Sequence, residues 1–147
     1  MPGRPYWELT PRQSVGNECA RRGRPRVVAG CVALLRGEAV DDDLVIALGG
    51  PAGQVVLDEG PRESQAYWLR VWGARGLLYA WDDEATEAVI AALGDTAWRV
   101  REMAAKVIAR HRLGSALDAV TELRDDPVPR VRAAANRATI VLTAAGS

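Results

Sequence analysis

The chain has 147 residues, 48% apolar and 26% charged, a composition typical of a soluble globular protein with a core of its own. Nineteen basic residues balance nineteen acidic ones, so the formal net charge is zero, whereas a protein that binds nucleic acid over its whole surface would be more basic. The charge is uneven: residues 1–39 carry +4, residues 40–66 carry −5 and residues 67–147 carry +1.

Residues 1–62 predict an irregular helical cap that belongs to the same domain as the rest of the chain. Segments 10–22 and 24–37 each begin with a proline near a helix start, and we interpret them as two helices. The sequence RRGRP at 21–25 contains the core of an AT-hook, an extended segment for the minor groove. We favour a turn between the two helices at this position.

Residues 41–61 fit either of two structures. Two short helices, 42–48 and 51–57, would be separated by a Gly-Pro break. A β-hairpin around GGPAG is the alternative, since apolar runs that flank a Gly/Pro cluster allow it, and the runs alone do not decide. A chain built of helical hairpins favours the helices.

Residues 63–147 repeat with a period of 31, because segments 67–79, 98–110 and 129–141 agree in chemistry column by column. The columns hold an apolar residue, an arginine, a small residue and a second cation. In that order they are Leu69, Val100 and Val131; Arg70, Arg101 and Arg132; Gly73, Ala104 and Ala135; and Arg75, Lys106 and Arg137. Each segment therefore predicts a helix with its apolar and small columns turned to the core.

Capping residues set the expected starts of these helices. Ser64, Asp95 and Asp126 precede the three segments as N-caps, and Pro127 suits a first helical position. Shorter amphipathic helices are expected before the second and third segments, over 82–93 and 115–123, the latter opening with a Ser-x-x-Asp capping box.

Two columns change character in the last segment. Asn136 stands where Ala74 and Ala105 stand earlier, and Thr139 stands in the column of Leu77 and Ile108. Polar residues at interior columns are what a terminal capping repeat needs, and they predict that the array ends there.

The pattern Asp-x-x-x-Arg-Val-Arg-x-x-Ala-Ala after an apolar helix resembles the HEAT repeat, in the short form found in phycobilisome-lyase-type HEAT-like proteins. The resemblance covers residues 64–142. It implies an all-α, right-handed α-α solenoid of helical hairpins of about 31 residues that binds partners, and it does not imply a lyase activity. It also implies an inter-repeat ladder of partly buried hydrogen bonds, formed by Asp95, Arg101, Asp126 and Arg132.

The second-cation column lies opposite the core, where it predicts a basic stripe on the concave surface of the solenoid. The stripe would consist of Arg75, Arg99, Lys106, Arg110, Arg130 and Arg137. Trp68 occupies the column of Arg99 and Arg130, so it would be an apolar anchor for a partner. An ordinary solvated face with Glu102 among the cations is the alternative. Trp72 and Trp81 are expected to pack the joint between the cap and the repeats.

No catalytic constellation is visible. His111 lies between two arginines at a helix end, and the acidic runs at 41–43 and 82–84 lack the spacing of a calcium loop. Cys19 and Cys31 fit no metal or redox spacing, and the chain starts without an apolar signal region. We therefore expect a cytoplasmic bacterial protein, not an enzyme, without metal or cofactor, that is a monomer with free thiols.

The sequence favours a protein-binding scaffold that recognises an acidic patch or helix of a partner protein. DNA or RNA binding by the same basic stripe is the alternative, with a steep salt dependence as the discriminator. A third hypothesis is an accessory subunit that grips a chromophore or a carrier protein.

Overall fold

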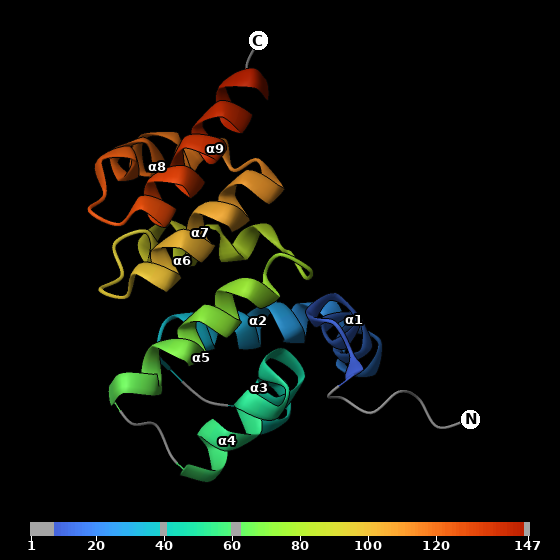
Figure 1. The fold of residues 1–147 in the computed structure, drawn as a ribbon. Coiled ribbons are helices and arrows are strands. Elements are labelled where there is room, and N and C mark those ends of the chain that lie inside the picture. The colour runs from blue at the N-terminus through green and yellow to red at the C-terminus, as the bar shows by residue number, and fades with distance from the viewer. Residues whose placement is uncertain (1–7, 39–40, 60–62, 146–147) are drawn as a thin grey trace. The chain divides into compact units, whose positions relative to one another are not determined.

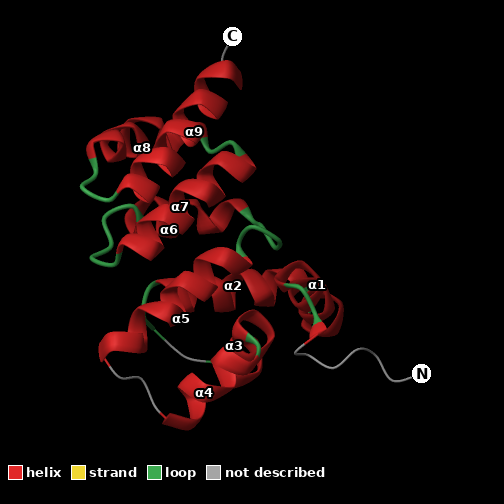
Figure 2. Ribbon diagram, in the orientation of Figure 1, coloured by secondary structure: helices red, strands yellow, loops and turns green. Residues whose placement is uncertain are grey.

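The computed structural model describes residues 8–38, 41–59 and 63–145, and all regular structure in these ranges is helical (Figures 1 and 2). The predicted all-α fold is thereby confirmed for this part of the chain. The chain forms two compact units, an N-terminal unit Met1–Asp82 and a C-terminal unit Asp83–Ser147. The change from cap to repeats predicted at 62/63 concerns the sequence pattern and stays a prediction.

The first two predicted helices are present as α1 (Pro11–Arg22) and α2 (Arg24–Leu35). Thr10 and Gln13 form a capping box at the start of α1. Gly23, with φ of 91°, makes the turn between the helices, a conformation that glycine adopts at little cost. Arg24 and Pro25 lie in the first turn of α2, so RRGRP is a turn, as favoured, and not the extended segment that an AT-hook requires.

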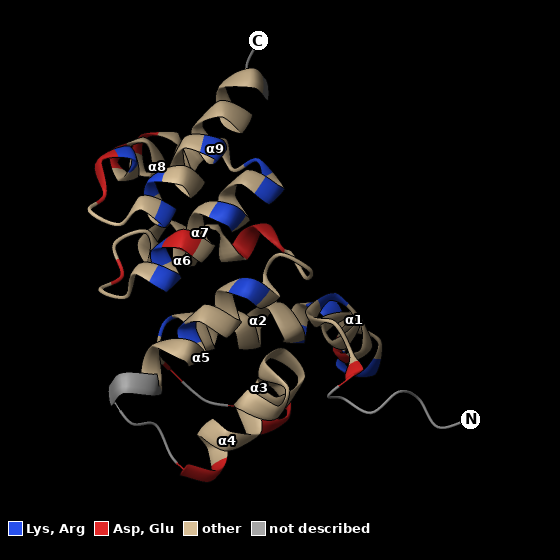
Figure 3. Cartoon of the chain, in the orientation of Figure 1, with Lys and Arg blue, Asp and Glu red and all other residues tan. Residues whose placement is uncertain are grey.

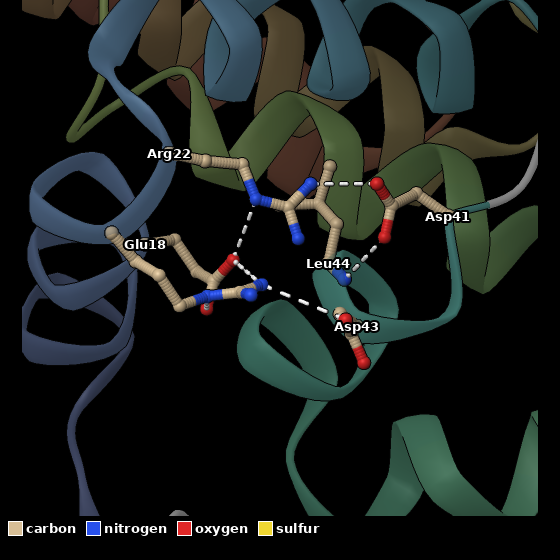
Figure 4. Close-up of polar contacts among 6 residues, drawn as sticks. Glu18, Arg22, Asp41, Asp43 and Leu44 are labelled. Carbon is tan, nitrogen blue, oxygen red and sulfur yellow. Dashed lines mark hydrogen bonds and ion pairs between the residues drawn. The ribbon is translucent and has the colours of Figure 1, made fainter.

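Residues 41–59, the described part of the segment 41–61, form helices and no hairpin, as α3 (Asp42–Gly49) and α4 (Pro51–Glu59). Asp41 caps α3, because its Oδ1 accepts a hydrogen bond of 3.0 Å from the backbone N–H of Leu44. Figure 4 shows that Arg22 reaches from α1 to both Glu18 and Asp41. Its Nε lies 2.9 Å from Glu18 Oε2 and its Nη1 lies 2.6 Å from Asp41 Oδ2, which fixes the end of α1 beside the start of α3.

Helix α5 (Glu63–Gly76) packs against α2 and α3 in the core of the N-terminal unit. Gly73 allows a close approach to α2, since a Cβ there would lie 2.7 Å from the carbonyl oxygen of Cys31. Trp72 is only 4% exposed and lies against Gly49 of α3, so it packs the interior. Ser64 lies inside α5, so its predicted role as the N-cap is wrong.

The C-terminal unit contains two helical hairpins. In the first, η2 (Asp83–Ala85) and α6 (Thr86–Ala92) precede α7 (Trp98–His111). In the second, η3 (Gly114–Ala116), α8 (Leu117–Glu122) and η4 (Leu123–Asp125) precede α9 (Pro129–Ala145). Helix α6 packs on α7, α8 packs on α9, and the two long helices pack on each other.

The interior of this unit follows the predicted columns. Val100, Ala104, Val131 and Ala135 are all 0% exposed. The polar substitutions of the last repeat behave differently from their equivalents: Asn136 is exposed and Thr139 is half-buried, whereas Ala105 and Ile108 are fully buried. The polar side chains of Asn136 and Thr139 are therefore not buried in the core, where they would need hydrogen-bond partners.

The predicted helix starts need correction. Asp95 and Asp126 accept hydrogen bonds from backbone N–H groups two residues later, at 2.8 Å from Ala97 and 2.9 Å from Val128. These turns precede the helices, which start three residues after each aspartate, because an aspartate side chain also satisfies the backbone in a local turn. Pro129, rather than Pro127, is the first residue of α9.

The predicted capping box of the shorter helix is wrong as well. Ser115 lies in η3, and α8 starts without a side-chain cap. None of the described helices combines the length and the hydrophobicity that crossing a lipid bilayer would require.

Candidate functional site

The predicted ladder centres on a buried ion pair between the two repeats of the C-terminal unit. Arg101 of α7 donates from Nε to Asp126 Oδ2 at 2.8 Å and from Nη2 to Asp126 Oδ1 at 3.1 Å. The two side chains are only 13% and 4% exposed. Arg101 also donates from Nη1 to the carbonyl oxygen of Asp95 at 2.9 Å, so one guanidinium joins the starts of consecutive second helices.

The remaining ladder positions repeat part of this geometry. Arg132 Nη1 donates to the carbonyl oxygen of Asp126 at 2.8 Å, the equivalent of the bond from Arg101 to Asp95. Burial by itself raises the pKa of the Asp126 carboxyl, but the hydrogen bonds from Arg101 and from the Val128 N–H, with the charges of Arg101 and Arg132, lower that pKa overall. The carboxylate is therefore held ionised inside the fold.

Five of the predicted stripe residues lie on α7 and α9. On α7 they are spaced seven and four apart, and on α9 they are seven apart, which places each set on one helix face. We call this set the basic surface. It comprises Arg99, Lys106, Arg110, Arg130 and Arg137. Figure 3 shows Lys and Arg positions along both helices.

One carboxylate lies among these cations. Glu102 of α7, whose side chain is 9% exposed, accepts from Arg130 Nε at 2.8 Å and lies 3.7 Å from Lys106 Nζ. The Arg130 pair ties α9 to α7, although its arginine is 61% exposed and such a pair stabilises little. Arg110 and Arg137 are exposed, so the surface keeps an excess of positive charge around a single buried acid.

The comparisons with known proteins fit this repeat geometry. A family model described as HEAT repeats matches residues 60–139. The chain belongs to the HEAT repeat family. Comparison of this chain with curated proteins and with solved structures found no match.

An aromatic member of the basic surface was not predicted. The ring of this HEAT repeat protein's Trp98 lies under two cations, with Arg99 Cζ at 4.5 Å and Arg130 Cζ at 5.2 Å from the ring centroid. Its position directly before Arg99, at the start of a second helix, was the signal that could have revealed it.

Arg75 does not behave like the rest of its column. It is half-buried in the N-terminal unit, where its Nη2 donates to the carbonyl oxygen of Leu48. Lys106 and Arg137, its equivalents in the repeat, are exposed. The difference arises because α3 packs on α5 and its Leu48 lies beside Arg75, so the predicted place of Arg75 on an exposed stripe is wrong.

Trp68 lies with Arg75 in a cavity of about 420 Å³ between α3, α4 and α5. It is half-buried and stacks on Trp72, with ring centroids 6.1 Å apart. In the described ranges, no three His, Cys, Asp or Glu side chains gather in a way that could hold a metal ion. Cys19 and Cys31 are free thiols, and burial raises the pKa of Cys31 to about 12.

Proposed function

We propose that this HEAT repeat protein is a non-enzymatic scaffold whose basic surface docks an acidic patch or an acidic helix of a partner protein. HEAT repeats generally serve as protein-interaction scaffolds, and helical solenoids offer extended surfaces for that purpose. The observation that carries the proposal is the set of five cations on one side of α7 and α9, with Glu102 as the carboxylate among them.

Trp98 takes the anchor role in this proposal. A large aromatic ring flanked by arginines is typical of the residues that contribute most to protein interfaces. Trp68, the anchor proposed from the sequence, belongs to the cavity of the N-terminal unit together with Arg75.

The proposal extends to the finer features of the repeat. The spacing of 31 residues supports the short, right-handed form of the HEAT repeat that resembles the phycobilisome-lyase type. The same proposal describes a monomer in a bacterial cytoplasm. The arginine-rich composition, in which Lys106 is the only lysine, supports only its bacterial part, because it is typical of a GC-rich genome.

Charge reversal on the basic surface tests this function. The variant Lys106→Glu/Arg110→Glu/Arg137→Glu changes exposed side chains and spares the buried Arg101–Asp126 pair. The matched control, Arg12→Glu/Arg26→Glu/Arg36→Glu, reverses three exposed arginines of the N-terminal unit. Each protein is immobilised, checked for folding by circular dichroism, and used to capture binding partners from native lysate with and without nuclease.

We expect a nuclease-resistant partner with an acidic surface that wild type and control capture and that the basic-surface variant loses. Equal capture by all three proteins would rule the basic surface out. Capture that nuclease abolishes would move the protein to the nucleic-acid-binding class, and affinity for a defined duplex would then fall steeply with rising salt.

A further inference from the structure

The cavity between α3, α4 and α5 has the size and lining of a small-molecule site. Its volume of about 420 Å³ lies within the range of about 300–1,000 Å³ that is usual for ligand pockets. Trp68 and Trp72 line one side, and Ala52, Val55 and Val56 of α4 line the other. Val55 is 47% exposed at the surface, which leaves an apolar opening to solvent.

Among the described residues that line this cavity, Arg75 is the only cation and the others are apolar. The Arg75 guanidinium forms one hydrogen bond, to the Leu48 carbonyl oxygen, and its buried Nε–H has no acceptor among the described residues. No carboxylate of the described chain pairs with it. A buried charged donor without a partner destabilises a fold, so an anion placed here would satisfy a group that the protein leaves unsatisfied.

The second cavity of the same unit provides a contrast. It measures about 310 Å³, and its cation is Arg21. Arg21 Nη2 lies 2.9 Å from Glu18 Oε2 and 3.6 Å from Asp43 Oδ2, so both acids that line the cavity neutralise it. The absence of such acids among the described residues distinguishes Arg75 from Arg21.

We propose that the cavity binds a small organic monocarboxylate, with its carboxylate on the Arg75 guanidinium and an aromatic or branched apolar body between Trp68 and α4. Arginine binds carboxylates through a planar fork of donors, and the tryptophan faces accept an apolar ring. With one cation among apolar walls, phosphate or a dicarboxylate would place additional charge in the cavity without a partner.

Calorimetric titration with a matched pair of probes tests this site. The probes are 4-phenylbutyrate and its neutral amide, 4-phenylbutyramide, with inorganic phosphate as a third titrant. We expect the acid to bind at least about tenfold more tightly than the amide, because a charge-assisted hydrogen bond is lost in the amide. Phosphate should not bind at the same concentrations.

Three variants make the result specific to the cavity. Arg75→Gln should weaken binding of the acid at least about tenfold and leave binding of the amide unchanged. Val55→Asp, at the opening, should weaken the acid through charge repulsion, whereas Val55→Asn should do so much less. The two Val55 variants keep the test informative if Arg75→Gln does not fold.

NMR spectra locate the bound probe. The indole N–H signals of Trp68 and Trp72, assigned by Trp→Phe variants, should shift on addition of 4-phenylbutyrate, and that of Trp98 should not. The basic-surface variant should bind the probe like wild type, so a failure here is distinguishable from a failure of the proposed function. Equal affinity for acid and amide, unchanged affinity in Arg75→Gln, or no saturable binding would overturn the proposal.

Discussion

Arg101 of the C-terminal unit and Arg75 of the N-terminal unit both come from second helices of the repeat pattern, and both are largely withdrawn from water. Arg101 is held by two hydrogen bonds to the Asp126 carboxylate and one to the Asp95 carbonyl oxygen. Among the residues that the structure describes, Arg75 has the Leu48 carbonyl oxygen as its hydrogen-bond partner. Among the described residues, the fold thus supplies a counter-charge for Arg101, which joins repeats, and none for Arg75, which lines a cavity.

This difference indicates that Arg101 has a structural role, whereas Arg75 is available to bind a ligand. Burying an ion pair contributes little net stability, but removing one partner of a buried pair is strongly destabilising because a charge is left uncompensated. For Arg101 that charge is Asp126. For Arg75 no such charge exists in the described chain, so substitution of Arg101 should destabilise the fold strongly and substitution of Arg75 should change its stability only slightly.

Arg101→Ala should produce the largest effect, a loss of about 3 kcal/mol or more in the free energy of unfolding, because it strands the Asp126 carboxylate. Urea unfolding followed by circular dichroism measures it. Arg137→Ala, on the exposed side of α9, is the control and should change stability by less than about 0.5 kcal/mol. An Arg101→Ala protein that unfolds like wild type would show that the pair is not structural.

Gly73→Ala should destabilise the N-terminal unit by about 1–3 kcal/mol, because the added Cβ meets backbone atoms of α2 that do not move aside easily. That Cβ would lie 2.7 Å from the Cys31 carbonyl oxygen and 3.0 Å from the Leu35 nitrogen. Gly16→Ala in α1 is the control, since nothing lies within 4 Å of its Cβ, and it should stabilise by about 0.5–1 kcal/mol. Equal effects of the two substitutions would contradict the close approach of α5 to α2.

Acid should remove the contribution of Asp126 to stability. Its pKa is lowered in the fold, so this contribution is complete above the unfolded-state pKa of about 3.9 and is lost as the pH falls through the folded value. The difference in unfolding free energy between wild type and Asp126→Asn should be constant from about pH 5 to 7 and shrink below about pH 4. A difference that stays constant to lower pH would mean that the fold does not lower the pKa of the Asp126 carboxyl.

Arg75→Met should have the smallest effect, a change within about 1 kcal/mol in either direction, because it removes a desolvated cation and leaves no carboxylate unpaired. Arg101→Met, measured in the same urea titration, should still be destabilised strongly through Asp126. If both methionine variants lose the same stability, Arg75 has a structural role that its contacts do not reveal.

The repeat columns predicted the core because each side chain's depth depends on helical periodicity, which the sequence carries directly. Val100, Ala104, Val131 and Ala135 are buried for this reason. The helix starts were placed early because an aspartate caps a helix and closes a preceding turn with the same side-chain oxygen, and spacing does not distinguish the two.

Arg75 shows that equivalent positions in a sequence repeat need not be equally exposed. Its equivalence to Lys106 and Arg137 is real in the sequence, but its exposure depends on α3 and α4, which come from the segment without a repeat. The role of Trp98 was not predicted for a similar reason, since Arg130, the second cation against its ring, comes from the next repeat. Both cases required contacts between elements that are distant in the sequence.

The alkylation rate of Cys31 can measure how often the α2–α5 contact opens. Its thiol is 0% exposed, lies where a Cβ on Gly76 would come within 2.6 Å of Sγ, and has a pKa raised to about 12 by burial. An alkylating reagent therefore reaches a reactive thiolate only after α5 separates from α2. The rate of its modification, measured against that of the half-buried Cys19, reports how often the N-terminal unit opens under native conditions, without denaturant and without altering the sequence.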